Sequence, residues 1–227
     1  MTIEYHKIQS VYKRDDRGRF LVGQWATPWM EPLKDIEWQF TEKVDGTNIR
    51  VHFTRDPQPT VRFGGRTDKA QISTKLLAVL QELFLVDRMA DAFPDCDDVL
   101  LFGEGYGAGI QRGGIYRDSP NFILFDVMVG PWLLEWSNVV DVAQKLDIPL
   151  VPIVGHGSLD DAINLASVGF KSKVSDKPTL DLPVAEGLVC RPTADLFDRK
   201  GERVIVKVKH KDFKGQPAIA AAQGTTP

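Results

Sequence analysis

The stretch Glu42-Lys43-Val44-Asp45-Gly46-Thr47-Asn48 is the most informative part of this chain, because it is the first of five short motifs. The other four come after it in this order: Phe102-Gly103-Glu104-Gly105, Phe122-Ile123-Leu124-Phe125-Asp126, Glu186-Gly187-Leu188-Val189 and Val206-Lys207-Val208-Lys209. Each stretch alone has an ordinary explanation, such as a surface lysine beside a turn or the end of a strand. Their joint occurrence across most of the chain is much harder to assign to chance, so they are best interpreted together.

The composition is that of an ordinary water-exposed protein with a sizeable core. The chain has 227 residues, 43% of them hydrophobic and 26% charged, and a net charge of −3. No apolar run approaches the roughly 20 residues that span a bilayer, and the first residues show no signal-peptide pattern. Two cysteines, Cys96 and Cys190, make no disulfide framework and favour a reducing, cytoplasmic setting, with a phage or bacterial cell as one plausible source.

Hydrophobic periodicity predicts an α+β fold with a mixed, largely antiparallel sheet and helices packed on it. Residues 36–54 read as strands interrupted at Asp45-Gly46, and residues 60–63 read as a return strand. Further strands are expected at 99–104, 122–129, 188–191 and 203–209. Helical spacing predicts one helix over 72–92, a second from Ser137 to Leu146 and a third from Ser158 to Ala166.

The chemistry of the set centres on a lysine nucleophile. A protonated lysine is a poor nucleophile, and neighbouring cations or burial are needed to activate it. Lys207 and Lys209 are candidates for that role, because an i, i+2 pair on a strand points to one face. The same two lysines would offset the charge of a triphosphate during phosphoryl transfer.

Carboxylates follow several of the predicted strands. Glu104, Asp126 and Glu186 each lie at or near the end of an apolar run, where an acidic group can hold a ribose hydroxyl or a Mg²⁺ ion. Asp45 lies beside Gly46, which permits a sharp turn next to Lys43. The aromatic Phe125 is placed to stack on a base. Together these residues indicate an enzyme that carries a nucleotide on Lys43.

In these stretches the chain resembles the covalent nucleotidyltransferases, the superfamily of ATP-dependent ligases and mRNA capping enzymes. Within it the chain is most similar to RNA ligases of the RNA ligase 2 type. Glu42–Asn48 resembles the nucleophile motif, and Phe102-Gly103-Glu104 with the later Gly109-Ile110-Gln111-Arg112 resembles the third motif and its loop. The resemblance covers about residues 4–214, whereas the region 130–180 carries none that can be named.

The resemblance implies a role for each matching residue. Lys43 would attack the α-phosphate of ATP and hold AMP, with Glu186, Lys207 and Lys209 completing the catalytic group. The implied nucleotide-binding residues are Glu42 near adenine, Glu104 on the ribose, Phe125 on the base, Asn48 and Arg66 on the phosphates or the acceptor end, and Lys207 and Lys209 on the α-phosphate. Mg²⁺ or Mn²⁺ would accompany ATP, with Glu186 and Asp45 as the candidate metal ligands.

Two features depart from the RNA ligase 2 pattern. Asp45 stands where several such ligases have histidine, while DNA ligases and capping enzymes have aspartate there. The chain also ends soon after Lys209, where relatives carry a further domain. We therefore expect a nucleotidyltransferase (adenylation) domain over residues 1–215, a flexible tail over 216–227 and no separate C-terminal domain.

The leading hypothesis is an ATP-dependent RNA ligase that acts on RNA ends or a nicked duplex. It would form lysyl-AMP, transfer AMP to a 5′-phosphate and join that end to a 3′-hydroxyl. The alternatives are a minimal DNA ligase of the same superfamily and a non-sealing subunit that binds nucleotide or RNA ends. A helper subunit for sealing is a further expectation, and no membrane partner is expected.

Overall fold

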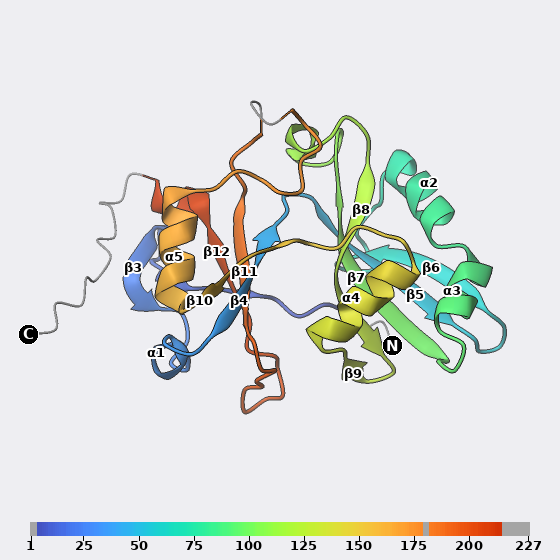
Figure 1. Ribbon diagram of the computed structural model, residues 1–227, viewed down its shortest axis with the longest axis horizontal. Helices are drawn as coiled ribbons and strands as arrows, with labels where there is room; N and C mark the ends of the chain where they lie inside the picture. The colour runs from blue at the N-terminus through green and yellow to red at the C-terminus, as the bar shows by residue number, and fades with distance from the viewer. Residues whose placement is uncertain (1–3, 179–181, 215–227) are drawn as a thin grey trace, which may run out of the picture. The chain divides into compact units, whose positions relative to one another are not determined.

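The computed structural model describes residues 4–178 and 182–214, and its elements are labelled in Figure 1. The helices are α1 (Met30–Leu33), α2 (Thr74–Leu83), α3 (Val86–Ala92), α4 (Trp136–Lys145) and α5 (Leu159–Val168), with 3-10 turns η1 (Gly113–Ile115) and η3 (His210–Phe213). The strands are β1 (Gln9–Ser10), β2 (Tyr12–Arg14), β3 (Phe20–Trp25), β4 (Trp38–Lys43), β5 (Thr47–Thr54), β6 (Thr60–Gly65), β7 (Asp98–Tyr106), β8 (Asn121–Val129), β9 (Trp132–Leu133), β10 (Ile153–Gly157), β11 (Gly187–Pro192) and β12 (Val206–Lys209).

The described chain divides into two compact units. The first unit contains residues 4–5, Val44–Val151 and residues 175–178 and 182. The second unit contains His6–Lys43, Pro152–Val174 and residues 183–214. The chain passes from the second unit into the first at the peptide bond that follows Lys43.

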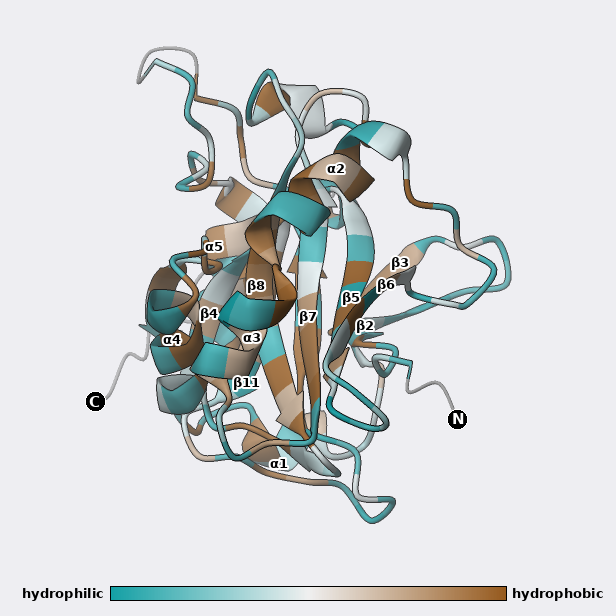
Figure 2. Cartoon of the chain, turned by 90° about the vertical axis from the view of Figure 1, so that its right-hand side faces the viewer, coloured by the Kyte–Doolittle hydropathy of each residue, from teal (hydrophilic) through white to brown (hydrophobic). Residues whose placement is uncertain are grey.

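The first unit is an antiparallel sheet covered on one face by helices. Its strand order is β6-β5-β7-β8-β9, and α2, α3 and α4 pack on it around a core that includes Ile49, Leu80, Leu101, Phe122 and Val139. Hydrophilic and hydrophobic residues alternate along α3 and α4, as expected for helices that bury only one side (Figure 2). The opposite face of the sheet carries alternate residues of β5 and β7.

The second unit has its own sheet and its own core. Its strand order is β1-β12-β11-β4-β10, in which β1 pairs with β12 in parallel and the other pairings are antiparallel. Helix α5 packs on one face through Leu159, Ala162 and Ile163, against a core that includes Leu188 and Val206. A two-stranded sheet of β2 and β3 belongs to the same unit.

The predicted α+β class with largely antiparallel sheets is confirmed. The strands expected on both sides of Asp45-Gly46 are β4 and β5, and the return strand is β6. Ser158 caps α5 as expected, within a capping box completed by Asp161. The predicted tail over 216–227 lies outside the described residues.

Two helix predictions were wrong. The single helix expected over 72–92 is two helices, because Phe84 and Leu85 leave the helical conformation with ψ angles of 61° and 143°. Phe84 is 2% exposed and packs edge-on against Phe122, so core packing of this side chain accompanies the break. The other helix starts at Trp136 rather than being capped by Ser137, which lies inside α4.

Sequence patterning missed several short strands. These are β1, β2, β3, β9 and β10. With two to six residues each, they offer little alternation for a periodicity argument. Across the residues described, no helix combines the length and the apolar character that crossing a membrane requires.

Candidate active site

The sheet of the second unit brings two of the predicted lysines onto one cross-strand row. Lys43 at the end of β4 and Lys209 at the end of β12 are both register partners of Gly187, the first residue of the central strand β11. Neighbouring strands lie about 4.8 Å apart, so the two lysine Cα atoms are roughly 10 Å apart. Gly187 has no side chain, so no side chain of β11 stands between the two lysine side chains at this position.

The carboxylate of Glu186 occupies that space and pairs with both lysines. Its Oε2 lies 2.9 Å from Lys43 Nζ, and Lys209 Nζ donates to its Oε1 at 2.6 Å. The side chains are largely shielded, with exposed fractions of 21% for each lysine and 12% for Glu186. One carboxylate therefore holds two ammonium groups in a shared, partly desolvated cluster.

Burial and charge act in opposite directions on the pKa of Glu186. Burial is the largest single influence and raises it, while the charges and hydrogen bonds of Lys43 and Lys209 lower it. The lysines together outweigh burial, so the pKa of Glu186 lies below its ordinary value. The carboxylate is thus held ionised beside Lys43.

Gly187 is required by the backbone geometry of this row. Its φ is +153°, and a Cβ atom built on it would lie 2.1 Å from the Val208 carbonyl oxygen of β12. Any side chain would therefore force β11 and β12 apart. The glycine that follows Glu186 in this motif is therefore required by the packing of β11 against β12, apart from any chemical role of the motif.

Lys207 lies on the same sheet face as Lys209. Val206 and Val208, which alternate with these lysines along β12, are buried in the core of the second unit, so the two lysines face away from that core. Lys207 pairs with Val189 of β11 and with Ser10 of β1. The expected i, i+2 arrangement is present in the structure.

Glu42 is buried on β4, and its carboxylate is held by the segment after α5. It is 1% exposed, and its two oxygens accept from Ser172 Oγ at 2.5 Å and from the Lys173 backbone N–H at 2.7 Å. Burial raises the pKa of Glu42, and these hydrogen bonds offset only part of that effect. Ser172 and Lys173 belong to the region 130–180, for which the sequence supplied no role.

In the first unit, Asn48 and Glu104 are directly paired residues of β5 and β7. They lie on the face of the sheet opposite the helices, since Ile49, next to Asn48, and Leu101, three positions before Glu104, point into the helix-covered core. The carboxamide oxygen of Asn48 is buried and accepts no hydrogen bond from the residues described. Paired partners on one face place a carboxylate and an amide within reach of one small molecule.

Phe125 sits at an irregularity in β8. The pairing of β7 with β8 shifts by one residue at this point, where Phe102 pairs with Asp126 and Gly103 with Leu124. The Phe125 ring lies 5.1 Å, edge-on, from the ring of Tyr5, whose hydroxyl donates to buried Asp126 at 2.8 Å. The bulge and this tyrosine set the position of the aromatic ring, and Tyr5 was not anticipated from the sequence.

The Asp45-Gly46 turn rests on the glycine-rich loop after β7. The Asp45 backbone N–H donates to the hydroxyl of buried Tyr116 at 3.2 Å. A Cβ atom on Gly46 would lie 2.2 Å from the Gly105 carbonyl oxygen, so only glycine fits this close approach. The turn after Lys43 is therefore shaped by backbone from a strand about sixty residues away in sequence.

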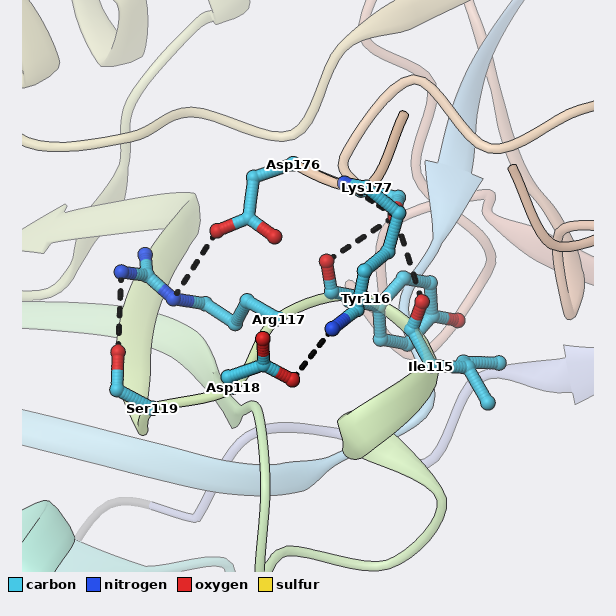
Figure 3. Close-up of polar contacts among 8 residues, drawn as sticks. Ile115, Tyr116, Arg117, Asp118, Ser119, Asp176 and Lys177 are labelled. Carbon is cyan, nitrogen blue, oxygen red and sulfur yellow. Dashed lines mark hydrogen bonds and ion pairs between the residues drawn. The ribbon is translucent and has the colours of Figure 1, made fainter. Parts of the chain in front are cut away.

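Residues 175–177 are bound to that same loop, and Figure 3 shows Asp176 and Lys177 beside it. Ser175 Oγ donates to the Tyr116 carbonyl at 3.0 Å, and the Asp176 N–H donates to the same oxygen at 3.0 Å. Lys177 pairs with Asp118, and Asp176 lies 3.9 Å from Arg117. These contacts account for part of the uninterpreted region as a support for the loop that carries Tyr116.

Arg66 lies in an exposed bend directly after β6. The buried guanidinium of Arg50 holds this bend, donating to the Gly65 carbonyl at 2.8 Å and to Asp68 at 2.7 Å. Arg50 and Asp68 also line a cavity of about 550 Å³, together with His52, Arg62 and Asp98. The sequence showed no signal for Arg50 beyond its place two residues after Asn48.

The described residues contain no group of three or more His, Cys, Asp or Glu side chains suited to a metal ion. Asp45 belongs to the first unit, while Glu186 belongs to the second and is paired with two lysines. Mg²⁺ is commonly held by one or two carboxylates together with substrate phosphates. The residues present suit a metal ion that arrives on phosphate oxygens better than a resident ion.

The sequence model for the RNA ligase family matches residues 36–209, which include every predicted site residue. The chain belongs to the RNA ligase family.

Solved structures of an RNA ligase from Naegleria gruberi share this fold. A variant with ATP and manganese matches at a TM-score of 0.66 and 17% identity over 91% of this chain and 56% of that one. The enzyme with pyrophosphate matches at a TM-score of 0.60 and 18% identity, over 92% of this chain and 62% of that chain. A variant with AMP and manganese matches at a TM-score of 0.57 and 17% identity, over 91% of this chain and 62% of that chain.

The family assignment confirms the resemblance inferred from the motifs, and the structural matches confirm the nucleotidyltransferase fold. This chain spans about 56–63% of the length of the Naegleria ligase chains. Within this RNA ligase family member, Lys43, Lys207 and Lys209 lie on one sheet, with Glu186 directly before its strand β11, and Asn48, Glu104 and Phe125 lie on another. The roles of these residues remain predictions.

Proposed function

We propose that this chain is the nucleotidyltransferase part of an ATP-dependent RNA ligase that forms a covalent lysyl-AMP on Lys43. The observation that carries the proposal is the Lys43–Glu186–Lys209 cluster built across Gly187. Family membership and the RNA ligase fold support the reaction class. The relatives with ATP, AMP or pyrophosphate are consistent with adenylyl transfer as its first step.

The cluster suits a lysine that must switch between two states. Paired with Glu186, Lys43 is an ammonium ion, whereas the species that attacks phosphorus is the neutral amine. The Glu186 carboxylate, 2.9 Å from Lys43 Nζ, is within reach to receive the proton. The amine then forms the bond to the α-phosphorus while the bond to pyrophosphate breaks.

Lys207 and Lys209 supply positive charge on the same sheet face. In the proposed reaction they contact the α-phosphate and stabilise the charge that moves onto the departing pyrophosphate. Once AMP is attached, the Lys43 nitrogen no longer carries a charge to pair with Glu186. The carboxylate is then available to the later steps, in which AMP passes to a 5′-phosphate and a 3′-hydroxyl displaces it.

The sheet of the first unit suits recognition of the nucleoside. In this proposal Glu104 accepts hydrogen bonds from the ribose, Phe125 stacks on the base, and Asn48 and Arg66 contact phosphate. Glu42 shapes the chain next to the base, since its own carboxylate is already held by Ser172 and Lys173. Mg²⁺ or Mn²⁺ bound to ATP would offset phosphate charge, and Asp45 and Glu186 are each kept as a candidate metal ligand.

The test is the intact mass of the protein after incubation with ATP and Mg²⁺. We expect a gain of one AMP that is absent in Lys43→Ala. Lys75→Ala, which removes an exposed lysine from the start of α2, is the matched control and should gain AMP normally. Absence of any AMP adduct on folded, AMP-free wild-type protein would overturn the proposal.

A non-sealing subunit that binds nucleotide or RNA ends is the main alternative. The net charge of −3, where a nucleic-acid-binding protein is often strongly basic, motivates it. It predicts binding of ATP without a covalent adduct, so the same experiment separates the two functions when binding is measured in parallel. A minimal DNA ligase differs from an RNA ligase in preferring DNA on the 3′-hydroxyl side of a nick.

A further inference from the structure

The buried side chain of Arg50 donates hydrogen bonds to the bend that carries Arg66. Arg50 is 3% exposed, and Nε donates to the Gly65 carbonyl while Nη2 pairs with Asp68 Oδ1. Gly64, its cross-strand partner, leaves room for the guanidinium, because a Cβ atom there would lie 3.0 Å from Arg50 Nη2. One planar side chain thus contacts both ends of the bend.

The rest of the bend is equally constrained. The Ala70 N–H donates to the Thr67 carbonyl at 3.0 Å, closing a turn. A Cβ atom on Gly65 would lie 2.5 Å from Ala70 Cβ, so the chain returns closely onto itself. Arg66 projects from this bend as an exposed residue, held by backbone on both sides.

We propose that Arg50 and Asp68 form a clamp that positions Arg66 for its contact with the phosphates of the nucleotide. This inference rests on the proposed function, because that function gives Arg66 its role. Arg50 is a positioning residue rather than a catalytic one, since its Nε and Nη2 are already engaged within the protein. A guanidinium suits the task because its fixed fork can bind a carbonyl and a carboxylate at once.

The clamp predicts that Asp68 matters only through Arg66. Asp68 is the better residue to change, because its side chain is 64% exposed and its loss leaves Arg50 bonded to Gly65. We expect Asp68→Ala to slow lysyl-AMP formation about tenfold when Arg66 is present and less than about twofold in an Arg66→Ala background. Asp68→Asn keeps one acceptor oxygen and should recover part of the rate.

Asp91→Ala, which removes an exposed carboxylate from α3, is the matched control and should leave the rate unchanged. Equal fold-effects of Asp68→Ala in both backgrounds would overturn the clamp, as would an unchanged rate in Asp68→Ala. Wild type is measured alongside. If it forms lysyl-AMP but the effect of Asp68→Ala does not depend on Arg66, the clamp is refuted while the proposed function stands.

Hydrogen exchange tests the clamp without any reaction. Backbone amides of residues 64–70 should exchange faster in Asp68→Ala than in wild type, and at the wild-type rate in Asp91→Ala. If wild type fails to form lysyl-AMP, the proposed function is refuted and this measurement decides whether the clamp exists. Unchanged exchange in Asp68→Ala would refute the clamp whatever the activity.

Discussion

At the scale of single residues, the candidate site depends on one carboxylate that forms ion pairs with two lysines. Glu186 holds Lys43 and Lys209 at 2.9 and 2.6 Å in surroundings that are largely shielded from water. A charge pair in such a position is costly to break, because the remaining partner is left without compensation. Both the reactivity of Lys43 and the stability of this sheet should therefore depend on Glu186.

Replacing Glu186 with glutamine should slow lysyl-AMP formation by about a hundredfold, because the amide cannot accept the proton from Lys43. The measurement is the rate of AMP attachment with saturating ATP. Glu202→Gln changes an exposed carboxylate in the turn after Phe197 and serves as the control. A Glu186→Gln variant that reacts at the wild-type rate would remove Glu186 from the mechanism.

The lowered pKa of Glu186 predicts a pH-dependent contribution to stability. A carboxyl whose pKa is lower in the folded state stabilises the protein above its unfolded-state value, and that contribution is lost as the pH falls through the folded-state value. We expect Glu186→Gln to reduce the free energy of unfolding by about 2 kcal/mol at pH 7. Urea titrations of both proteins from pH 7 downward should show this difference shrinking below pH 4.5, the ordinary value for this group. A difference that stays constant with pH would contradict the ion-pair interpretation.

At the scale of elements, the strand β11 organises the lysine row. It lies next to both β4 and β12, so a single register sets the positions of Lys43 and Lys209. Sequence spacing placed Lys207 and Lys209 on one face, but the pairing of β4 with β11 joins residues more than 140 positions apart. Only such long-range pairing can bring Lys43 to this row.

Gly187→Ala should disturb that register. The new Cβ would approach the Val208 carbonyl at 2.1 Å, and the φ of +153° is unfavourable for alanine. We expect a loss of about 2 kcal/mol in the free energy of unfolding, measured by urea titration. Gly114→Ala is the control, because its Cβ would meet only Ala108 Cα at 3.8 Å. Equal stability of the two variants would contradict the close approach of β11 and β12.

Helix α5 supports the same sheet from its core face, and its start depends on the capping box of Ser158 and Asp161. Ser158→Ala should lower the free energy of unfolding by about 1 kcal/mol, because the Asp161 N–H loses its acceptor. Ser167→Ala, at a half-buried serine near the end of the helix, should change stability by less than about 0.5 kcal/mol. Thermal or urea unfolding of both variants measures this difference.

At the scale of the whole molecule, nucleic-acid preference is the property that the proposed function leaves to experiment. Asp45 is the residue type that the resemblance associates with DNA ligases, whereas family membership favours RNA. We expect nicked duplexes with RNA on the 3′-hydroxyl side to be sealed at least about tenfold faster than the DNA equivalents. Sealing assays on both substrates, with pre-adenylylated ends as a control for the first step, measure this ratio. Faster sealing of DNA would support the minimal DNA ligase.

Several features of this protein could be predicted from its sequence because they depend on local order. The strands on both sides of Asp45-Gly46, the return strand and the capped α5 all result from alternation, turn residues and a capping box. The ordered motifs also led to the RNA ligase family, since each motif couples a strand to the residue at its end. The short strands could not be predicted, because they offer little alternation, and the break at Phe84 could not be predicted, because it accompanies core packing of that side chain.

The sequence by itself determined the family, the fold class and the residue types of the candidate site. Tertiary structure alone decided that Glu186 holds both Lys43 and Lys209, that Ser172 and Lys173 hold Glu42, and that Arg50 holds the bend of Arg66. The physical reason is that a local pattern specifies which face a side chain occupies. Strand register and loop return, set by contacts distant in sequence, specify which partner it meets there.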